Sequence, residues 1–334
     1  MRIALVITPM TENNLRLAAQ IGVTDIVGRY PGPRLEDLLV LQDRVDRHGL
    51  KLSVIEGYIP HDHIVHGRSG REQQIDAFSE LIRHMGEAQV PILCYNFMPG
   101  DDWARTSTTA RQRGGARVTA FDLSDVAPAD GSMPSITAEE LWANLESFLR
   151  AVVPVAEEAG VKLALHPDDP PLAHFRDDDQ IVHSLEAFER VVRLVPSPAN
   201  GICFCQGCFA EIGADIPQTI RRLRQHIHYV HVRDVCGCLP KFQESFHDNG
   251  KTDMLEAMRA YHDIGFDGPM RPDHVPMLEG DEGSEDVSFV LPPADRINVD
   301  TFNGPNVVPS PGYTMAGRLF AVGYLRGLIE AAQA

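Results

Sequence analysis

The amino-acid sequence predicts an α/β protein that folds as a (β/α)8 TIM barrel. Eight short apolar segments alternate with eight amphipathic segments along the 334 residues. Alternating strand and helix units imply a parallel sheet with right-handed crossovers, and eight such units are the number that closes a barrel. The stretch after the first apolar segment reads ITPMTENN and holds no glycine. An open doubly wound sheet usually carries a glycine-rich phosphate loop there, so the closed barrel is favoured.

The first half of the chain contains four of the predicted strands. Their apolar runs lie at residues 2–8, 25–30, 51–58 and 91–98. The predicted helices between them span residues 11–21, 35–48 and 70–87. The last of these helices has an apolar stripe at helical spacing, formed by Ile75, Phe78, Leu81, Ile82 and Met85. A long polar segment follows the fourth strand, and such loops in compact domains usually serve a function.

The second half repeats the alternation and completes the barrel. Thr137 suits the N-cap of a helix over 137–158, because Glu139 and Glu140 place negative charge in its first turn. The remaining predicted strands lie at 161–166, 201–205, 227–233 and 269–274, and the remaining predicted helices at 184–194, 216–225, 252–264 and 313–332. We therefore expect a single domain over residues 1–334, with long loops at 99–136 and 279–312 over the active-site face.

The charge of the chain restricts its partners. Lysine and arginine number 30 and aspartate and glutamate 47, which gives a formal net charge of -17 at pH 7. A chain this acidic is poorly suited to bind nucleic acid or anionic membranes. An anionic substrate would need a local arginine or a metal ion to overcome the repulsion from this net negative charge. The sequence has no long apolar run typical of a transmembrane helix, and its first apolar run is too short for a signal peptide, so we expect a cytoplasmic protein.

Polar side chains gather at the ends of the last four predicted strands, where barrel enzymes place their chemistry. Each of these strands ends in one candidate metal ligand: His166, Cys205, His231 and Asp273. Adjacent strands lie about 4.8 Å apart, so the four side chains can converge. Two imidazoles, a thiolate and a carboxylate suit a divalent transition ion such as Mn2+, Fe2+, Co2+ or Zn2+. They are a poor match for Mg2+ or Ca2+, which prefer oxygen ligands.

The remaining cysteines allow a rival interpretation, a separate structural zinc cluster. The chain has six cysteines: Cys94, Cys203, Cys205, Cys208, Cys236 and Cys238. The spacing C-x-C-x2-C within residues 203–208 differs from the paired C-x2-C pattern of structural zinc sites. Without a secretion signal the cysteines are interpreted as thiols or metal ligands, and a disulfide framework is not expected.

Short motifs near the strand ends point to a known family. In the first half these motifs are VIE at 54–56, RSG at 68–70, CYNFMP at 94–99 and DWART at 102–106. In the second half they are HPDDPP at 166–171, CQG at 205–207, HYVHVR at 228–233, FHD at 246–248, Gly250, DM at 253–254, RPDH at 271–274 and PGY at 311–313. The YNFMP and RPDH segments, with their spacing, are the most specific. The chain resembles the D-mannonate dehydratase family, a branch of the xylose isomerase-like barrels.

The resemblance implies an activity and a set of site residues. It implies a lyase that removes water from D-mannonate to give 2-keto-3-deoxy-D-gluconate, with Mn2+ or Fe2+ as cofactor. The metal ligands that it implies are His166, Cys205, His231 and Asp273, and the acid/base groups are His274 and Tyr313. Family members commonly begin with an aromatic-rich first strand, whereas this chain begins RIALVITPM without tryptophan. The departure affects the substrate pocket and leaves the metal chemistry unchanged.

Dehydration of a sugar acid needs three kinds of group. A base removes the C2 proton, an acid protonates the leaving 3-hydroxyl, and positive charge stabilises the enediolate between these steps. We assign His274 and Tyr313 as the acid/base pair, with Asp273 beside them, and leave open which of the pair is the base. The expected substrate-binding residues are Glu56, Asn96, Arg105, His247 and Arg271, since an arginine fork suits a carboxylate.

Three other functions remain open at this point. The first is a sugar isomerase or epimerase on the same barrel, which would typically pair two carboxylates with the metal; Glu56 is one, and a second strand-end glutamate is not evident. The second is a dehydratase for a different aldonic acid. The third is a catalytically silent carbohydrate-sensing protein. The expected partner is a small sugar acid, and a homodimer is compatible with the sequence.

Overall fold

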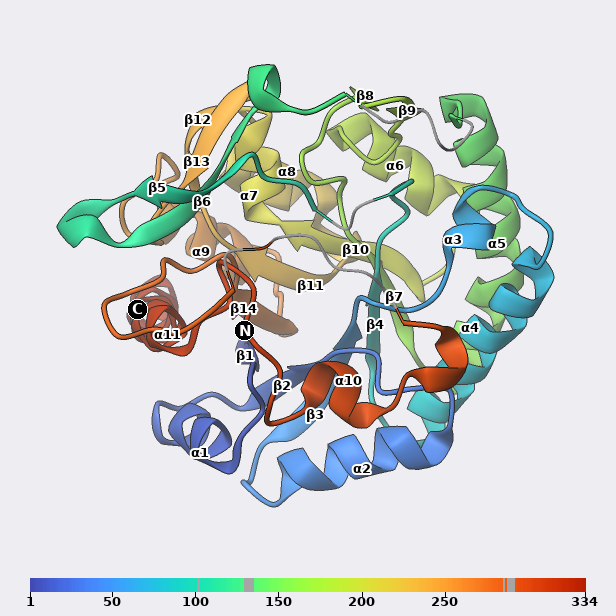
Figure 1. The fold of residues 1–334 in the computed structure, drawn as a ribbon, viewed down its shortest axis with the longest axis horizontal. Coiled ribbons are helices and arrows are strands. Elements are labelled where there is room, and N and C mark those ends of the chain that lie inside the picture. The colour runs from blue at the N-terminus through green and yellow to red at the C-terminus, as the bar shows by residue number, and fades with distance from the viewer. Residues whose placement is uncertain (101–102, 129–134, 285, 287–291) are drawn as a thin grey trace.

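A computed structural model describes residues 1–100, 103–128, 135–284, 286 and 292–334, and it confirms the predicted barrel (Figure 1). Among these residues, eight parallel strands form a closed barrel in the order β1-β14-β11-β10-β7-β4-β3-β2. The barrel strands are β1 (Arg2–Val6), β2 (Asp25–Gly28), β3 (Lys51–Glu56), β4 (Ile92–Tyr95), β7 (Lys162–Leu165), β10 (Asn200–Cys205), β11 (Ile227–Val232) and β14 (Pro269–Pro272). Each predicted strand is present, usually a few residues shorter than expected.

Helices surround the barrel, as the amphipathic segments predicted. The main helices are α1 (Glu12–Gln20), α2 (Leu35–Asp46), α4 (Arg71–Glu87), α5 (Ala138–Ala159), α6 (Leu185–Leu194), α8 (Ile216–Leu223), α9 (Met254–Asp263) and α11 (Met315–Gln333). The predicted cap of α5 is confirmed, because the Thr137 side chain accepts from the backbone N–H of Glu140 and the Glu140 side chain accepts from that of Thr137. No helix in the described part of the chain is both long enough and apolar enough to cross a membrane.

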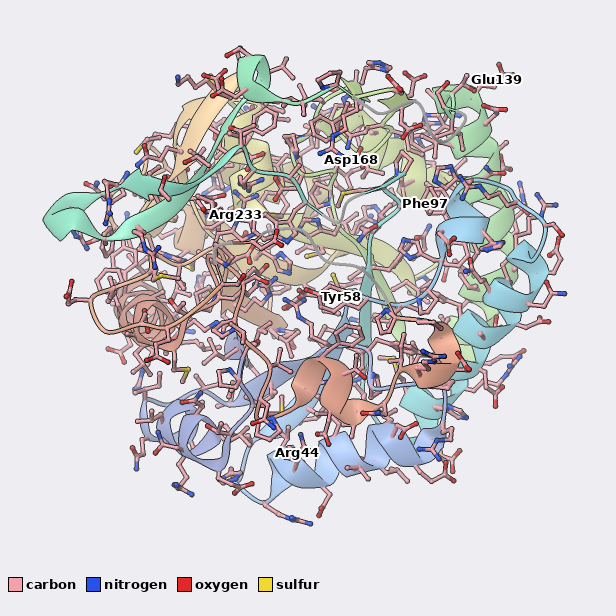
Figure 2. All side chains as sticks on the ribbon, in the orientation of Figure 1. Arg44, Tyr58, Phe97, Glu139, Asp168 and Arg233 are labelled. Carbon is pink, nitrogen blue, oxygen red and sulfur yellow. The ribbon has the colours of Figure 1, made fainter. Side chains whose placement is uncertain are left out.

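Apolar side chains fill both faces of the barrel strands. The interior contains mostly small residues and two cysteines, namely Ala4, Val6, Val27, Val54, Ile92, Cys94, Ala164, Cys203 and Tyr229. Larger side chains pack between the strands and the helices, and Phe78, Phe148 and Tyr95 form edge-to-face ring contacts there. Strands buried on both faces have continuous runs of apolar residues, and these runs explain why the strands could be predicted from the sequence. Figure 2 shows Arg44 and Glu139 toward the periphery and Tyr58 near the middle of the view.

A four-stranded antiparallel sheet, which the sequence did not predict, lies beside the barrel (Figure 1). We call it the accessory sheet. Its strands have the order β12-β13-β6-β5 and comprise β5 (Ser107–Arg111), β6 (Arg117–Asp122), β12 (Val235–Cys238) and β13 (Lys241–Glu244). The first pair follows the carboxyl end of β4 and the second pair follows that of β11. The accessory sheet therefore joins two loops from the face where the predicted site residues lie.

The remaining described elements are short. They are the strands β8 (His174–Phe175) and β9 (Asp178–Asp179), the helices α3 (Asp62–Val65), α7 (Gln206–Glu211) and α10 (Val299–Asn303), and the 3-10 helices η1 (Arg113–Gly115), η2 (Leu123–Asp125), η3 (Arg224–His226) and η4 (Ala294–Arg296). The two predicted loops, 99–136 and 279–312, therefore contain secondary structure. Parts of them, 101–102, 129–134, 285 and 287–291, lie outside the described residues, as does Asp102 of the DWART motif.

Candidate active site

One cavity lies where the carboxyl ends of the barrel strands converge. It encloses about 540 Å³ of empty space, part of it open to solvent. The lining residues come from the ends of six strands and from two loops: Arg29, Glu56, Gly57, Tyr58, Cys94, Tyr95, Asn96, Met98, Trp103, His166, Asp169, His231, Arg271, Asp273, His274 and Tyr313. Most of the predicted site residues are in this set, as expected for a barrel whose chemistry lies at this end.

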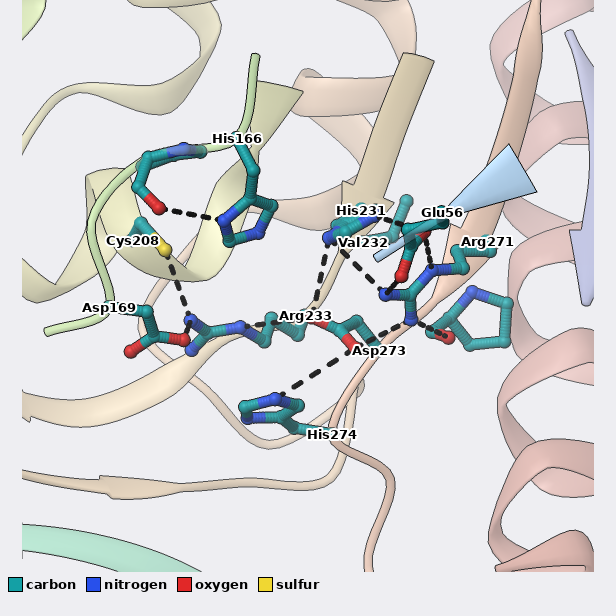
Figure 3. Close-up of polar contacts among 12 residues, drawn as sticks. Glu56, His166, Asp169, Cys208, His231, Val232, Arg233, Arg271, Asp273 and His274 are labelled. Carbon is teal, nitrogen blue, oxygen red and sulfur yellow. Dashed lines mark hydrogen bonds and ion pairs between the residues drawn. The ribbon is translucent and has the colours of Figure 1, made fainter. Parts of the chain in front are cut away.

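Three of the four predicted metal ligands lie together. One ligand atom each from His166, Cys205 and His231 falls within 4.8 Å of the others. Parallel pairing sets Cys205 opposite His231 on neighbouring strands, and His166 comes directly after β7. Figure 3 shows the His166 ring, whose Nδ1 lies 2.7 Å from the carbonyl oxygen of Pro167. That contact leaves Nε2 of His166 available to a metal ion.

Asp273 lies beside this trio and already has partners. Its Oδ1 is 2.6 Å from Nη1 of Arg271, and its Oδ2 is 3.6 Å from Nδ1 of His231. Arg271 also reaches Glu56, with Nη2 2.8 Å from Oε1 (Figure 3). Nε2 of His231 lies 3.0 Å from Oε2 of Glu56. A metal-bound histidine commonly donates its other nitrogen to a carboxylate, so Glu56 is placed to orient His231.

The charges around the trio favour a thiolate. Burial alone would raise the pKa of the Cys205 thiol, but a hydrogen bond from Cys208, the Arg233 guanidinium and contacts with both histidines hold it well below its usual value. Burial and Arg271 oppose protonation of His231, yet Glu56 and the nearby thiols raise its pKa well above its usual value. The thiolate form is the one that binds metal. The donor set therefore fits a divalent transition ion.

His274 and Tyr313 both line the cavity, and their rings meet edge to face with centroids 5.6 Å apart. The Tyr313 hydroxyl donates to Oδ1 of Asp273 at 3.1 Å, and the Trp103 ring lies 4.8 Å from the His274 ring. His274 has a backbone φ of 41°, a left-handed conformation that non-glycine residues rarely adopt and that tends to mark functional sites.

A single main-chain hydrogen bond connects the segments that carry these two residues. The N–H of Val275 donates to the carbonyl of Gly312 at 2.8 Å. Gly312 has a φ of 86°, and a Cβ there would approach Cα of His274 to 3.0 Å. Only glycine combines this conformation with such a close approach. The backbones of His274 and Tyr313 are thus held at a fixed spacing.

The predicted substrate-binding residues divide into two groups. Glu56, Asn96 and Arg271 line the cavity, whereas Arg105 and His247 are outside its lining. Nε2 of His247 is 2.8 Å from the carbonyl of Val232, and Arg105 is buried in ion pairs with Asp169 and Glu244. The lining of this cavity therefore does not support the prediction that Arg105 and His247 contact the substrate, and that role stays a prediction.

Next to the cavity, and sharing Asp169 with its lining, is a buried ionic cluster that the sequence did not indicate. It consists of Arg105, Arg233, Asp169, Glu211 and Glu244, whose side chains are at most 2% exposed. Burial and the neighbouring Asp169 raise the pKa of Glu211 well above its usual value. With Glu211 protonated, two guanidinium groups face two carboxylates, and the charges of the cluster balance.

The rival zinc interpretation finds little support among the six cysteines. Cys236 and Cys238 are exposed on β12, while the other four are buried. Two further groups of possible ligands exist, Cys94 with Cys203 and His231, and Asp169 with Cys208 and Glu211. The second group lies against Arg233, whose Nη2 contacts both Cys208 and Asp169. A guanidinium there disfavours a cation.

Comparison with known proteins identifies the family. The profile of the family described as D-mannonate dehydratase (UxuA) matches residues 14–133 and 131–290. Mannonate dehydratase 2 of Halalkalibacterium halodurans is 32% identical over 326 residues, covering 89% of this chain and 87% of the relative. A mannonate dehydratase of Streptococcus equi subsp. zooepidemicus is 34% identical over 327 residues, covering 89% and 83%. The chain belongs to the D-mannonate dehydratase family.

Solved structures agree with this membership. The crystal structure of mannonate dehydratase from Streptococcus suis serotype 2 superposes with a TM-score of 0.85 at 32% identity, covering 100% of this chain and 95% of that one. A structure of L-ribulose 3-epimerase superposes with a TM-score of 0.62 at 16% identity, covering 99% and 95%. The second likeness concerns the fold alone. The resemblance expected from the motifs is therefore confirmed.

Sequence reasoning missed several residues of this D-mannonate dehydratase family site. Arg29 follows β2 and lines the cavity. The strand was predicted over residues 25–30, so Arg29 was placed within a strand and not after its end. Asp169 belongs to the HPDDPP motif and also lines the cavity. Trp103 belongs to the DWART motif and stacks near His274. These residues lie near the ends of predicted strands or belong to motifs that were already recognised, and these two signals could have identified them.

Proposed function

We propose that this protein dehydrates D-mannonate to 2-keto-3-deoxy-D-gluconate with the help of a divalent metal ion. One observation carries the proposal. In a chain of the D-mannonate dehydratase family, the donor atoms of His166, Cys205 and His231 gather within 4.8 Å of one another, next to a cavity that His274 and Tyr313 also line. A metal-ligand trio beside an acid/base pair is the combination that dehydration of a sugar acid requires.

The proposed metal ligands are His166, Cys205, His231 and Asp273, and the proposed ion is Mn2+ or Fe2+. The fit rests on the mixed donor set and on the low pKa of Cys205. Asp273 would exchange part of its contact with Arg271 for the ion. When bound, the ion supplies positive charge that stabilises oxygen anions of the substrate.

Arginines give the cavity a local positive character in a chain of net charge -17. Arg29 and Arg271 both line it and both pair with Glu56. Each guanidinium has more N–H donors than Glu56 uses, so a substrate carboxylate can bind between the two arginines. Asn96 also lines the cavity, which supports its proposed role in substrate binding.

The acid/base chemistry belongs to His274 and Tyr313. One of the two accepts the C2 proton of the bound acid, and the other donates a proton to the 3-hydroxyl, which leaves as water. The resulting enol then loses the proton of its 2-hydroxyl and takes up a proton at C3 to give the 2-keto product, so the atoms balance. Burial and Asp273 raise the pKa of Tyr313 above its usual value, which keeps its proton available for donation.

Activity on a panel of aldonic acids tests the proposal directly. The purified protein, loaded with Mn2+ or Fe2+ under anaerobic conditions, should release 2-keto-3-deoxy-D-gluconate from D-mannonate. Turnover of another aldonic acid in preference to D-mannonate would change the substrate and keep the chemistry. Isomerisation or epimerisation without loss of water, or metal binding without turnover of any acid, would contradict it.

A cysteine variant tests the metal site. We expect Cys205→Ser to lose most of its bound metal, measured by mass spectrometry of the elements, and to reduce kcat by about 100-fold or more, since the ion contributes several kcal/mol to transition-state stabilisation. The matched control is Cys236→Ser, because Cys236 is exposed on the accessory sheet. Equal metal content in the two variants would rule out Cys205 as a ligand.

We also propose a cytoplasmic location, which cell fractionation would test, and a homodimer, which size-exclusion chromatography with light scattering would test. The net charge of -17 and the sugar-acid substrate are consistent with a metabolic enzyme. Neither proposal bears on the chemistry of the site.

A further inference from the structure

We propose that Glu244, a residue of the accessory sheet, is a positioning residue that fixes the orientation and the tautomer of His274. The inference rests on the proposed role of His274 as an acid/base group. Nδ1 of His274 lies 2.9 Å from Oε1 of Glu244. Glu244 itself is outside the cavity lining, so it acts through the histidine and makes no contact with the substrate.

The register of the accessory sheet brings Glu244 to this place. In β13, Phe242 pairs with Phe121 and Gln243 pairs with Ala120 of β6, while Glu244 pairs with Val235 of β12. Alternation along the strand buries Phe242 and Glu244 on the inner face and leaves Lys241 exposed. Side chains of one strand alternate between the two faces, so the carboxylate of Glu244 must point toward the barrel.

Two guanidinium groups keep Glu244 ionised and in place. Nη2 of Arg105 lies 2.7 Å from its Oε1, and Nη1 of Arg233 lies 2.9 Å from the same atom. Although burial raises the pKa of a carboxyl group, the Arg233 and Arg105 guanidiniums, with the hydrogen bond to His274, lower that of Glu244 to about 2. Arg105 is in turn anchored by Asp169 at 2.6 Å. The cluster therefore presents a fixed negative oxygen to the histidine.

A fixed acceptor at Nδ1 determines the tautomer of His274. Two groups lie at Nδ1 of His274: Oε1 of Glu244 at 2.9 Å and Nη2 of Arg105 at 3.2 Å. A neutral imidazole carries one proton, and the closer carboxylate holds that proton on Nδ1, while the Arg105 N–H is taken up by the same Glu244 oxygen at 2.7 Å. The other nitrogen, Nε2, then carries the lone pair on the side of the ring toward Asp273, whose Oδ1 is 4.0 Å away. Asp273 lines the cavity, so Nε2 is the atom that can exchange a proton with the substrate.

The backbone at His274 makes such a support necessary. Its φ of 41° is rare for a histidine, and conformations of this kind persist only where neighbouring contacts enforce them. Trp103 packs near one side of the ring, and Glu244 is the acceptor that fixes its rotation. Glu244, the two arginines that hold it and the accessory sheet thus support the acid/base group.

Turnover of two Glu244 variants is the first part of the test. Loss of a group that orients an acid/base residue typically costs 10-fold to 100-fold. We expect Glu244→Ala to lower kcat by about 100-fold and Glu244→Gln, which keeps an acceptor, by about 10-fold, with KM for D-mannonate changed by less than about threefold. The control is Glu211→Gln, since Glu211 lies in the same cluster, 2.7 Å from Arg233, and is not among the contacts of His274. We expect its kcat to stay within about twofold of wild type.

The second part of the test does not depend on turnover. In protein labelled with 15N-histidine, the Nδ1 and Nε2 resonances of His274 are assigned by their loss in His274→Gln. We expect wild type and Glu211→Gln to show Nδ1 protonated, and Glu244→Ala to show Nε2 protonated or a mixture. Unchanged tautomer in Glu244→Ala, or equal kcat in the Glu244 and Glu211 variants, would overturn the proposal. If wild type fails to dehydrate any sugar acid, the proposed function fails, while the resonances still decide whether Glu244 sets the tautomer.

Discussion

Arg318 is a charged side chain whose burial has a measurable energetic cost. It lies in α11, is 1% exposed, and its guanidinium is 5.3 Å from the centroid of the Tyr313 ring. Its Nη1 and Nη2 have no hydrogen-bond partner among the described residues. Burial, with Arg271 and Arg29 nearby, lowers its pKa to about 9. At neutral pH the group is charged in both folded and unfolded states, so the full cost of burying the charge is present.

Replacing this arginine should therefore stabilise the protein. We expect Arg318→Met to raise the free energy of unfolding by about 2 kcal/mol, since an unpaired buried charge costs several kcal/mol and the lost ring contact offsets part of that gain. Urea denaturation of the protein free of added anions measures the change. Arg326→Met on the same helix, where the side chain is exposed, should stay within about 0.5 kcal/mol of wild type. A loss of stability in Arg318→Met would show that the buried guanidinium stabilises the fold and that its burial has no net cost.

Single residues of the site differ in how well the sequence predicted them. His166, Cys205 and His231 follow directly from strand ends, because strand periodicity and parallel pairing decide where they point. His274 and Tyr313 came from motifs. Glu244 could not be predicted, because its strand β13 is placed by antiparallel pairing with β6, whose residues lie more than a hundred positions earlier in the chain. Local pattern carries no information about such a partner.

Among the elements, the accessory sheet depends on a small aromatic core. Phe242 is 2% exposed and stacks on Phe121 at 5.6 Å, and the guanidinium of Arg105 lies 5.0 Å from its ring. Phe242 precedes Glu244 on the same face of β13. Its packing therefore supports both the sheet and the ionic cluster.

Truncation of Phe242 should weaken stability and activity together. We expect Phe242→Ala to lower the free energy of unfolding by about 3 kcal/mol, the usual cost of removing a buried phenylalanine, and to lower kcat because Glu244 loses its support. Phe175 also contacts Phe121, at 6.2 Å, but is only partly buried. Phe175→Ala should therefore have less than half the effect on stability and leave kcat near wild type. Equal effects of the two variants would show that the sheet has no special connection to the site.

The elements of the barrel were predictable because each is a local signal. Buried parallel strands appear as short apolar runs and their helices as amphipathic stretches. The accessory strands give no such signal, since β5 reads STTAR and β12 reads VCGC, with mostly polar or exposed residues. They form because loops after β4 and β11 meet at one end of the barrel, which is a property of the closed fold.

At the scale of the whole molecule, buried neutral histidines make stability depend on pH. His228 is 6% exposed, and its Nδ1 lies 2.8 Å from the carbonyl of Leu163. Burial lowers its pKa to about 4, and burial likewise lowers that of His247 to about 4. The unfolded chain binds these protons more readily than the folded chain. The stabilisation that comes from keeping these histidines neutral is therefore fully present above about pH 6.5, and it is lost as the pH decreases toward 4.

An acid titration of stability tests this dependence. We expect His228 alone to account for a loss of about 3 kcal/mol in the free energy of unfolding between pH 6.5 and pH 4. His228→Gln should flatten the profile by that amount, whereas His262→Gln, on the exposed side of α9, should leave its slope unchanged. Parallel profiles for all three proteins would show that His228 is already charged in the fold.

The hydrogen bond between Val275 and Gly312 has an evolutionary consequence. The chain leaves the barrel just after His274 and returns just before Tyr313, and this bond clamps the two crossing points together. Everything between them is an insertion whose ends already meet. Two side chains inside that insertion also hold the site: the Asp281 carboxylate accepts from Thr314 and Ala316, just after Tyr313, and the Asn303 amide binds the backbone of Arg29. Exchanging the rest of residues 279–309 between family members is therefore a practical route to new substrate preferences, provided that Asp281, Asn303 and Gly312 are kept.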